Sequence, residues 1–93
     1  MRHFDWNKEK NVELAEERDV SFEDVVEAIS EGKVLDTFNH PNQKKYPGQK
    51  VYIIEIRNYA YFVAYVEDKE KIFLKTIYPS RDATKKYLLK SKK

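Results

Sequence analysis

The junction "TIYPSRDATKKY", residues 76–87, places an arginine at the predicted start of a helix. Pro79 cannot donate a hydrogen bond to a sheet and so ends the preceding strand, and Ser80 is a favourable cap for a helix over about residues 81–90. Arg81 would then lie beside the free N–H groups of that helix, where its planar guanidinium can bind a phosphate through two hydrogen bonds. The junction predicts a catalytic phosphate contact at Arg81. The alternative is a surface arginine paired with a nearby carboxylate.

Two further residues near this junction are candidates for catalysis. Lys75 interrupts the apolar run "IFLKTI", where strand alternation places it on one face with Phe73 and Ile77. A charge at that position either faces solvent or belongs to a site. Tyr87 follows Arg81 by nearly two helical turns, so it either packs on the sheet or contributes a phenol to the same site.

The loop "NHPNQKKYPGQK", residues 39–50, contains a second group of candidates. The ordinary pKa of His40 suits both a base and an acid near neutral pH, although an Asn-His-Pro turn often uses its histidine for local hydrogen bonds. Lys44 and Lys45 are predicted RNA contacts. Tyr46 either joins them or anchors the loop to the sheet.

Arg57 and Lys85 complete the predicted RNA-binding residues. Arg57 shares strand parity with Glu55, so a cross-strand ion pair is the alternative to a phosphate contact. Lys85 lies in the predicted last helix and is secondary to Arg81.

Several kinds of chemistry are excluded by what the chain lacks. It has no cysteine, so a disulfide or a thiolate zinc site cannot form. Its two glycines, Gly32 and Gly48, are too few for a glycine-rich phosphate loop. The histidines are not clustered, and the acidic residues lack the spacing of a calcium loop. We therefore expect neither a metal nor a cofactor.

Charge is unevenly distributed along this chain of 93 residues, whose length fits one domain. The segment "ELAEERDVSFEDVVEAISE" is acidic, whereas the last twelve residues contain five lysines and one aspartate. This polarity indicates that different faces meet different partners, although the formal net charge is only +2. The sequence has neither a signal-like apolar run nor a stretch of membrane-spanning length, so we expect a cytoplasmic protein without membrane contact.

Local patterns predict the secondary structure. A helix over about residues 8–18 begins after Asn7, and a second begins after Ser21, with Asp24 placed as in a capping box, and ends near Gly32. Segments rich in β-branched and aromatic residues predict strands at 34–38, 50–57, 59–66 and 71–78. The predicted fold class is α+β: a small antiparallel sheet of three to four strands, with two N-terminal helices and one C-terminal helix packed on one face.

These motifs, in this order, resemble a known family. The segments "FDWNKEKN", "VSFEDVVEAI", "KKY" and "TIYPSRDATKKY" are similar to motifs of the BrnT-like toxins of bacterial type II toxin–antitoxin systems, over nearly the whole chain. The chain departs from the family pattern in several places, for example at Asn7, at Lys44 and Lys45, and at Pro79 and Ser80 before Arg81. The resemblance implies the fold of RelE-like ribonuclease toxins, metal-independent RNA cleavage, and a cognate antitoxin protein that blocks it.

Cleavage of RNA without a metal needs a base for the 2′-hydroxyl proton, an acid for the leaving 5′ oxygen and cations for the phosphorane. Histidine, tyrosine, lysine and arginine are present for these roles. We therefore expect an endoribonuclease, with a non-catalytic RNA- or protein-binding module of the same fold as the alternative. Catalysis would require Lys75, Arg81 and the loop over residues 40–46 to converge on one pocket. A homodimer and a heteromer are both compatible with the sequence.

Overall fold

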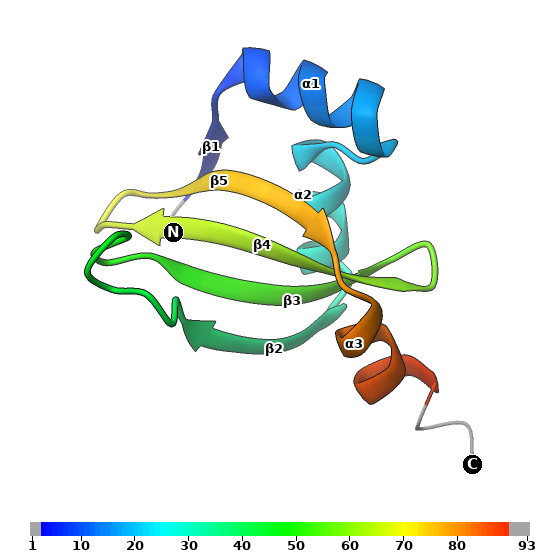
Figure 1. Cartoon of the computed structure of the whole chain (residues 1–93). Coiled ribbons are helices and arrows are strands. Elements are labelled where there is room, and N and C mark those ends of the chain that lie inside the picture. The colour runs from blue at the N-terminus through cyan, green and yellow to red at the C-terminus, as the bar shows by residue number, and fades with distance from the viewer. Residues whose placement is uncertain (1–2, 90–93) are drawn as a thin grey trace.

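A five-stranded mixed sheet forms the centre of the protein, which a computed structural model describes over residues 3–89 (Figure 1). The strands span His3–Trp6 (β1), Val34–Asn39 (β2), Lys50–Ile56 (β3), Tyr59–Glu67 (β4) and Lys71–Pro79 (β5). They lie in the order β1-β5-β4-β3-β2. β1 is parallel to β5, and the other neighbouring strands are antiparallel. β1 and β2 are therefore the two edges of the sheet.

Tight turns join β3, β4 and β5 into the predicted meander. Arg57 and Asn58 connect β3 to β4 and both have positive φ, 51° and 66°. A two-residue turn of this kind matches the twist of a hairpin. Between β4 and β5, the Asp68 carboxylate accepts the N–H groups of Glu70 and Lys71 at 2.8 and 2.9 Å. The turns of the meander are therefore formed by residues that are close in the sequence.

Two helices follow β1, and both begin at the predicted caps. They span Lys8–Arg18 (α1) and Phe22–Ser30 (α2). The Asn7 side chain accepts the N–H of Lys10 at 3.0 Å. The Ser21 hydroxyl accepts the N–H of Asp24, whose carboxylate accepts the N–H of Ser21 in return. These bonds satisfy N–H groups that have no partner within a helix, which confirms both caps.

Asn11 fastens α1 to α2. Its side-chain oxygen accepts the N–H of Phe22 at 2.7 Å, and its side-chain nitrogen donates to the Glu23 carboxylate at 2.8 Å. This second hydrogen bond, more than any other interaction, lowers the pKa of Glu23. One carboxamide thus sets the position of α2 relative to α1 at the first turn of α2.

The main core lies between α2 and one face of the sheet, which we call the α2 face. Buried apolar side chains from both layers meet there, among them Leu14, Val20, Phe22, Val25, Ile54, Val63, Leu74 and Ile77. The ring of Trp6, from β1, stacks on that of Phe22 with 5.8 Å between their centroids. The edge strand β1 is thereby tied to α2.

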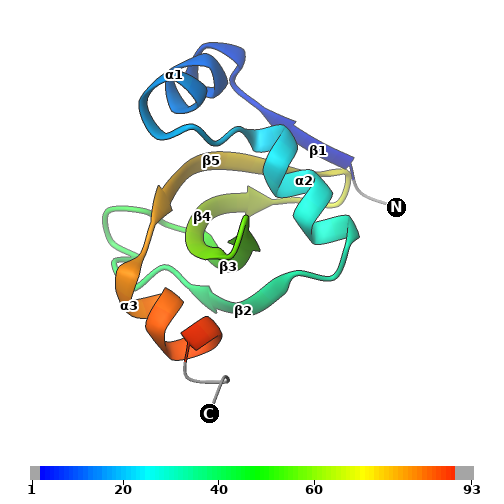
Figure 2. The same ribbon diagram turned by 90° about the vertical axis from the view of Figure 1, so that its right-hand side faces the viewer.

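The C-terminal helix packs on the opposite face of the sheet, which we call the α3 face (Figure 2). It consists of α3, Arg81–Thr84, and a π-helical continuation η1, Lys85–Leu89. Ala83 packs there against Ile53 and Ala60. The hydroxyl of Thr84 accepts the N–H of Ala60 at 2.9 Å, so the helix is bonded directly to β4. No helix among residues 3–89 is long and apolar enough to span a membrane.

The predicted fold class was wrong. Instead of an antiparallel sheet of three to four strands with all helices on one face, the sheet has five strands and is mixed. A strand precedes the two N-terminal helices, and α2 and α3 lie on opposite faces. The short segment His3–Trp6 pairs with β5, which is distant in the sequence, so its own residues carry little sign of the pairing.

Candidate nucleic-acid interface

Five aromatic rings form two groups, one of three rings on the α3 face and one of two rings in the loop between β2 and β3. We call the two groups together the aromatic ladder; its members are Phe38, His40, Tyr46, Phe62 and Tyr78. The Phe62 ring lies 5.9 Å from that of Phe38 and 5.5 Å from that of Tyr78, and the rings of His40 and Tyr46 are 4.5 Å apart. Phe62 and Tyr78 are direct partners across β4 and β5, so strand register places both rings on one face.

Tyr78 belongs to the three-ring group of the ladder and interacts electrostatically with the Tyr46 phenol of the other group. Burial raises the pKa of Tyr78, and the neighbouring Tyr46 phenol raises it further. Tyr78 nevertheless keeps 36% of its surface exposed. A neutral, half-covered ring can stack with a base and donate a hydrogen bond, and it does not repel a phosphate.

The loop between β2 and β3 holds His40 by local hydrogen bonds. Its Nδ1 accepts the N–H of Asn42 at 3.0 Å, so a neutral ring carries its proton on Nε2. The Gln43 side chain donates to the carbonyls of His40 and Gln49 and accepts the N–H of Gly48. His40 therefore makes the local hydrogen bond that its Asn-His-Pro turn predicted, and it does so through Nδ1.

Cations flank the aromatic ladder. Lys44 and Lys45 are exposed in the loop, and the Lys45 ammonium lies 5.5 Å from the centre of the Tyr46 ring. Arg81 is exposed at the start of α3, and its guanidinium makes no hydrogen bond or ion pair with the residues that the structure describes. Lys85 is exposed one turn further on. These charges can meet a phosphate without first breaking an internal ion pair.

The helix that begins at Arg81 differs from the predicted one. Its α-helical part is four residues long before η1 begins, and the hydroxyl of Ser80 already accepts the N–H of Ala83. The predicted attraction of an anion to a long helix end is therefore not available. Phosphate binding at this position depends on the Arg81 guanidinium itself.

A groove of about 530 Å³ opens between the aromatic ladder and the C-terminal helix. Its floor contains Phe38, Ile53 and Phe62 from three adjacent strands. Its rim contains polar groups from β2 and from the C-terminal helix, namely Asp36, Ser80, Asp82, Lys86 and Tyr87. The groove is therefore apolar at its base and carries both signs of charge at its edge.

Tyr87 crosses this groove to reach β2. Its hydroxyl donates to the Asp36 carboxylate at 2.7 Å. This hydrogen bond is the main cause of a raised pKa of Tyr87 and of a lowered pKa of Asp36. Both shifts keep the proton on the phenol at neutral pH. Tyr87 thus positions the C-terminal helix, and its phenol is a weaker acid than an ordinary tyrosine.

Lys75 lies in a different hollow from the groove. The pairing of β4 with β5 skips from Leu74 to Thr76, so Lys75 is the extra residue of a β-bulge. Phe73 and Lys75 share a face as predicted, but the prediction that Ile77 lies with them is wrong, because the bulge returns Ile77 to the core of the α2 face. Lys75 is exposed, lies 5.4 Å from the centre of the Phe73 ring, and lines a hollow that α1 borders.

The Arg57 side chain is held by contacts within the protein. Its guanidinium donates to the carbonyl of Asp19 and lies 3.5 Å from the Asp24 carboxylate. The predicted cross-strand ion pair is replaced by contacts with Asp19, in the α1–α2 connection, and with Asp24, in α2. Arg57 ties the β3–β4 turn to the start of α2, on the side of the molecule away from the aromatic ladder.

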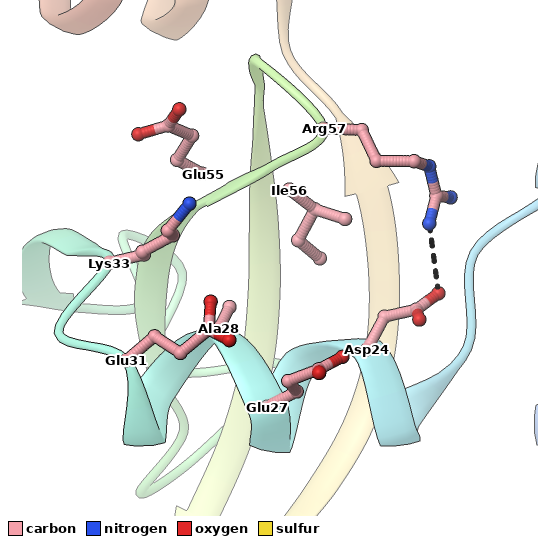
Figure 3. A pocket seen from close by; sticks show the side chains of 8 residues that line it. All are labelled: Asp24, Glu27, Ala28, Glu31, Lys33, Glu55, Ile56 and Arg57. Atoms are coloured by element: carbon pink, nitrogen blue, oxygen red, sulfur yellow. Dashed lines mark ion pairs between the residues drawn. The ribbon is translucent and has the colours of Figure 1, made fainter.

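A hollow of about 280 Å³ surrounds this ion pair on the α2 face (Figure 3). Four carboxylates and two cations line it: Asp24, Glu27, Glu31, Glu55, Lys33 and Arg57. Figure 3 shows the Arg57 side chain pointing toward Asp24 across the end of the hollow. Because carboxylates outnumber cations and one cation is already paired, this hollow would repel a phosphate. Part of the acidic segment of the sequence thus lies on the α2 face, on the side opposite the C-terminal helix.

The structure unites only part of the predicted site. His40 and Tyr46 are members of the aromatic ladder, Lys44 and Lys45 lie in the same loop, and Tyr87 lines the adjoining groove. Sequence reasoning missed Phe38, Phe62 and Tyr78, because short aromatic runs do not reveal which face a ring occupies. Among residues 3–89, no three histidine, aspartate or glutamate side chains are grouped as ligands for a metal ion.

Comparison with known proteins places the chain in a family. Residues 12–79 match a family described as a domain of unknown function (DUF4258), and the chain belongs to this family. The matched region begins within α1 and ends with β5. No curated protein and no solved structure shows a significant match.

Proposed function

We propose that this protein is a cytoplasmic RNA-cleaving toxin of a type II toxin–antitoxin system, which binds single-stranded RNA on the aromatic ladder. The observation that carries the proposal is the partly exposed ladder of five rings, with Arg81, Lys44 and Lys45 beside it. Stacked rings bind bases of any sequence, and flanking cations bind the phosphates. The resemblance to BrnT-like toxins supports the same conclusion, with an antitoxin as the protein partner.

In the proposed cleavage, the 2′-hydroxyl group of the RNA is the nucleophile. A base removes the proton of the 2′-hydroxyl, the resulting oxygen attacks the adjacent phosphorus, and the 5′ oxygen leaves with a proton from an acid. The products are a 2′,3′-cyclic phosphate and a 5′-hydroxyl. In this scheme Arg81 binds the charged phosphorane, and the imidazole of His40 transfers the proton through Nε2.

A non-catalytic RNA-binding module is the second candidate, and two observations favour it. Lys75 lies in a hollow away from the groove, so the predicted catalytic residues do not share one pocket. The phenols of Tyr78 and Tyr87 have raised pKa values, which makes them poor proton donors at neutral pH. Such a module would bind RNA with the same aromatic ladder and cations but would not cleave it.

One experiment separates these candidates. Purified protein is incubated with a 5′-labelled single-stranded RNA in EDTA, and RNA binding and product ends are followed together. The proposal expects binding, cleavage and a 2′,3′-cyclic phosphate end. Binding without cleavage would identify the non-catalytic module, and absence of both would overturn the function on RNA.

Arg81→Ala tests the phosphate contact, with Lys33→Ala, in the acidic hollow, as the matched control. Loss of one phosphate contact should reduce the slope of log affinity against log salt by about 0.7 for a single strand. Induced expression in cells gives the parallel readout, because Arg81→Ala should relieve growth inhibition and Lys33→Ala should not. Full toxicity of Arg81→Ala would contradict the assignment of Arg81.

A further inference from the structure

The groove beside the C-terminal helix has the size and the lining of a small-molecule site. Its volume of about 530 Å³ falls within the range of small-molecule sites, about 300–1,000 Å³. The phenyl rings of Phe38 and Phe62 meet edge to face at 79° on its floor, and Ile53 lies between their strands. An aromatic floor of this size suits a nucleobase.

The rim of the groove offers one hydrogen-bond acceptor and one donor on the same helix. Asp82 and Lys86 are four residues apart, and both line the groove. They form no ion pair with each other, and the Asp82 carboxylate accepts no hydrogen bond from the residues that the structure describes. By contrast, each oxygen of Asp36 already accepts one, from the Thr37 N–H and from the Tyr87 hydroxyl. Asp82 is therefore the carboxylate available to a ligand.

We propose that this groove binds a guanine base, with the Asp82 carboxylate accepting from N1–H and the N2 amine and the Lys86 ammonium donating to O6. The proposal rests on the proposed function in RNA binding and names the base that the RNA presents. Guanine alone among the four bases has two adjacent donors followed by an acceptor on its Watson–Crick edge, which is the pattern that one carboxylate and one ammonium complement.

The other bases fit this rim less well. Adenine and cytosine present one amine beside a ring nitrogen that accepts, and this nitrogen would face the second oxygen of Asp82 and repel it. Uracil has a single N–H between two carbonyl oxygens. Arg81 is exposed next to Asp82 and outside the groove, which suits a phosphate following the bound base. A phosphate inside the groove would instead meet the carboxylates of Asp36 and Asp82.

NMR titration of the full-length protein with mononucleotides tests the inference. Guanosine monophosphate should shift the amide signals of Asp36, Phe62 and Asp82, and should bind roughly tenfold more tightly than inosine monophosphate, which lacks the N2 amine. Adenosine monophosphate should bind more weakly than both. Equal affinities for the guanosine and adenosine nucleotides, or shifts confined to another surface, would overturn the proposal.

Two variants sharpen this test. Asp82→Asn should remove the preference for guanosine over inosine, whereas Lys86→Met should weaken both nucleotides equally, because both have O6. Glu17→Gln, on α1, is the control and should leave both affinities unchanged. A general structural effect of Asp82→Asn would lower both affinities and preserve their ratio, which would count against the proposal.

Oligonucleotides distinguish the base of an RNA from a free nucleotide. An oligouridylate with one guanosine should bind more tightly than the same strand with one inosine. If RNA binds without this preference, the inference fails while RNA binding stands. If guanosine monophosphate binds in the groove but no RNA binds or is cleaved, the proposed function fails and the groove is a site for free guanine nucleotides.

Discussion

The hydroxyl of Tyr87 donates a 2.7 Å hydrogen bond to the carboxylate of Asp36, a residue 51 positions earlier in the chain. This bond joins the π-helical end of the C-terminal helix to the edge strand β2. Leu88 and Tyr87 also pack against the apolar side chains of the α3 face. The Tyr87–Asp36 hydrogen bond thus joins the two walls of the groove, β2 and the C-terminal helix.

Replacing Tyr87 with phenylalanine should loosen this wall without unfolding the protein. The ring and its packing remain, and only the hydrogen bond to Asp36 is lost. We expect amides in η1 to exchange several-fold faster with solvent, while amides in β3 and β4 keep their protection. Unchanged exchange in η1 would contradict the role of this bond in holding the helix. Tyr59→Phe serves as a matched control, because the Tyr59 ring contacts that of Tyr61, which packs on the core of the α2 face, opposite the C-terminal helix.

The pKa of Asp36 should report the same bond. The pKa is lowered in the folded protein, so the stabilisation is present above the ordinary pKa of an aspartate and is lost as the pH falls through the lower folded value. The pKa of Tyr87 is raised, so its part is present below the ordinary pKa of a tyrosine and is lost as the pH rises through the higher folded value. The carboxyl-carbon NMR signal of Asp36 should titrate at higher pH in Tyr87→Phe than in the wild type. Identical midpoints would exclude the bond in solution.

Arg57→Ala should lower stability and leave RNA affinity unchanged. The guanidinium bonds to the Asp19 carbonyl and pairs with Asp24, and its side chain is 54% exposed, so we expect a loss of about 1 kcal/mol in the free energy of unfolding. Chemical denaturation measures this loss, and Lys69→Ala, in the exposed β4–β5 turn, is the control. Weaker RNA binding at unchanged stability would instead support the RNA contact that the sequence predicted for Arg57.

Thr84→Val should be among the more damaging changes in the C-terminal helix. The hydroxyl of Thr84 is the acceptor for the N–H of Ala60, and both residues are buried. Valine has nearly the same shape but leaves this N–H without an acceptor, which costs about 1–3 kcal/mol. Thr84→Ser keeps the hydroxyl and should lose clearly less on denaturation. No measurable loss in Thr84→Val would refute the role of the hydrogen bond.

Tyr78→Ala should weaken RNA binding if bases stack on the aromatic ladder. Loss of a stacking ring typically costs about 1–3 kcal/mol of binding free energy per base. Tyr78→Phe keeps the ring and should bind nearly as the wild type does. Tyr59→Ala removes a half-buried tyrosine that lies on the other face of β4 and should not change RNA affinity once folding is verified. Equal effects of the two alanine variants would locate the RNA elsewhere.

The accuracy of the sequence predictions follows the range of the interactions involved. The caps at Asn7 and Ser21 depend on residues three positions away, and both are confirmed. The parallel pairing of β1 depends on β5, near the other end of the chain, and no local pattern revealed it. At Lys75 an extra residue in one strand shifted the alternation on which the prediction relied. A prediction of the aromatic ladder would have required the register of the strands, which short sequence patterns do not reveal.

The parallel pairing of β1 with β5 also bears on how the protein resists mechanical force. His3 pairs with Lys71 and Trp6 with Leu74, so the first strand of the domain and its last strand point the same way. A pull that separates the start of β1 from the end of β5 would load their hydrogen bonds together, in shear, instead of opening them one at a time. Once the C-terminal helix has been drawn off the sheet, extension from the two ends should meet its greatest resistance at this pair of strands.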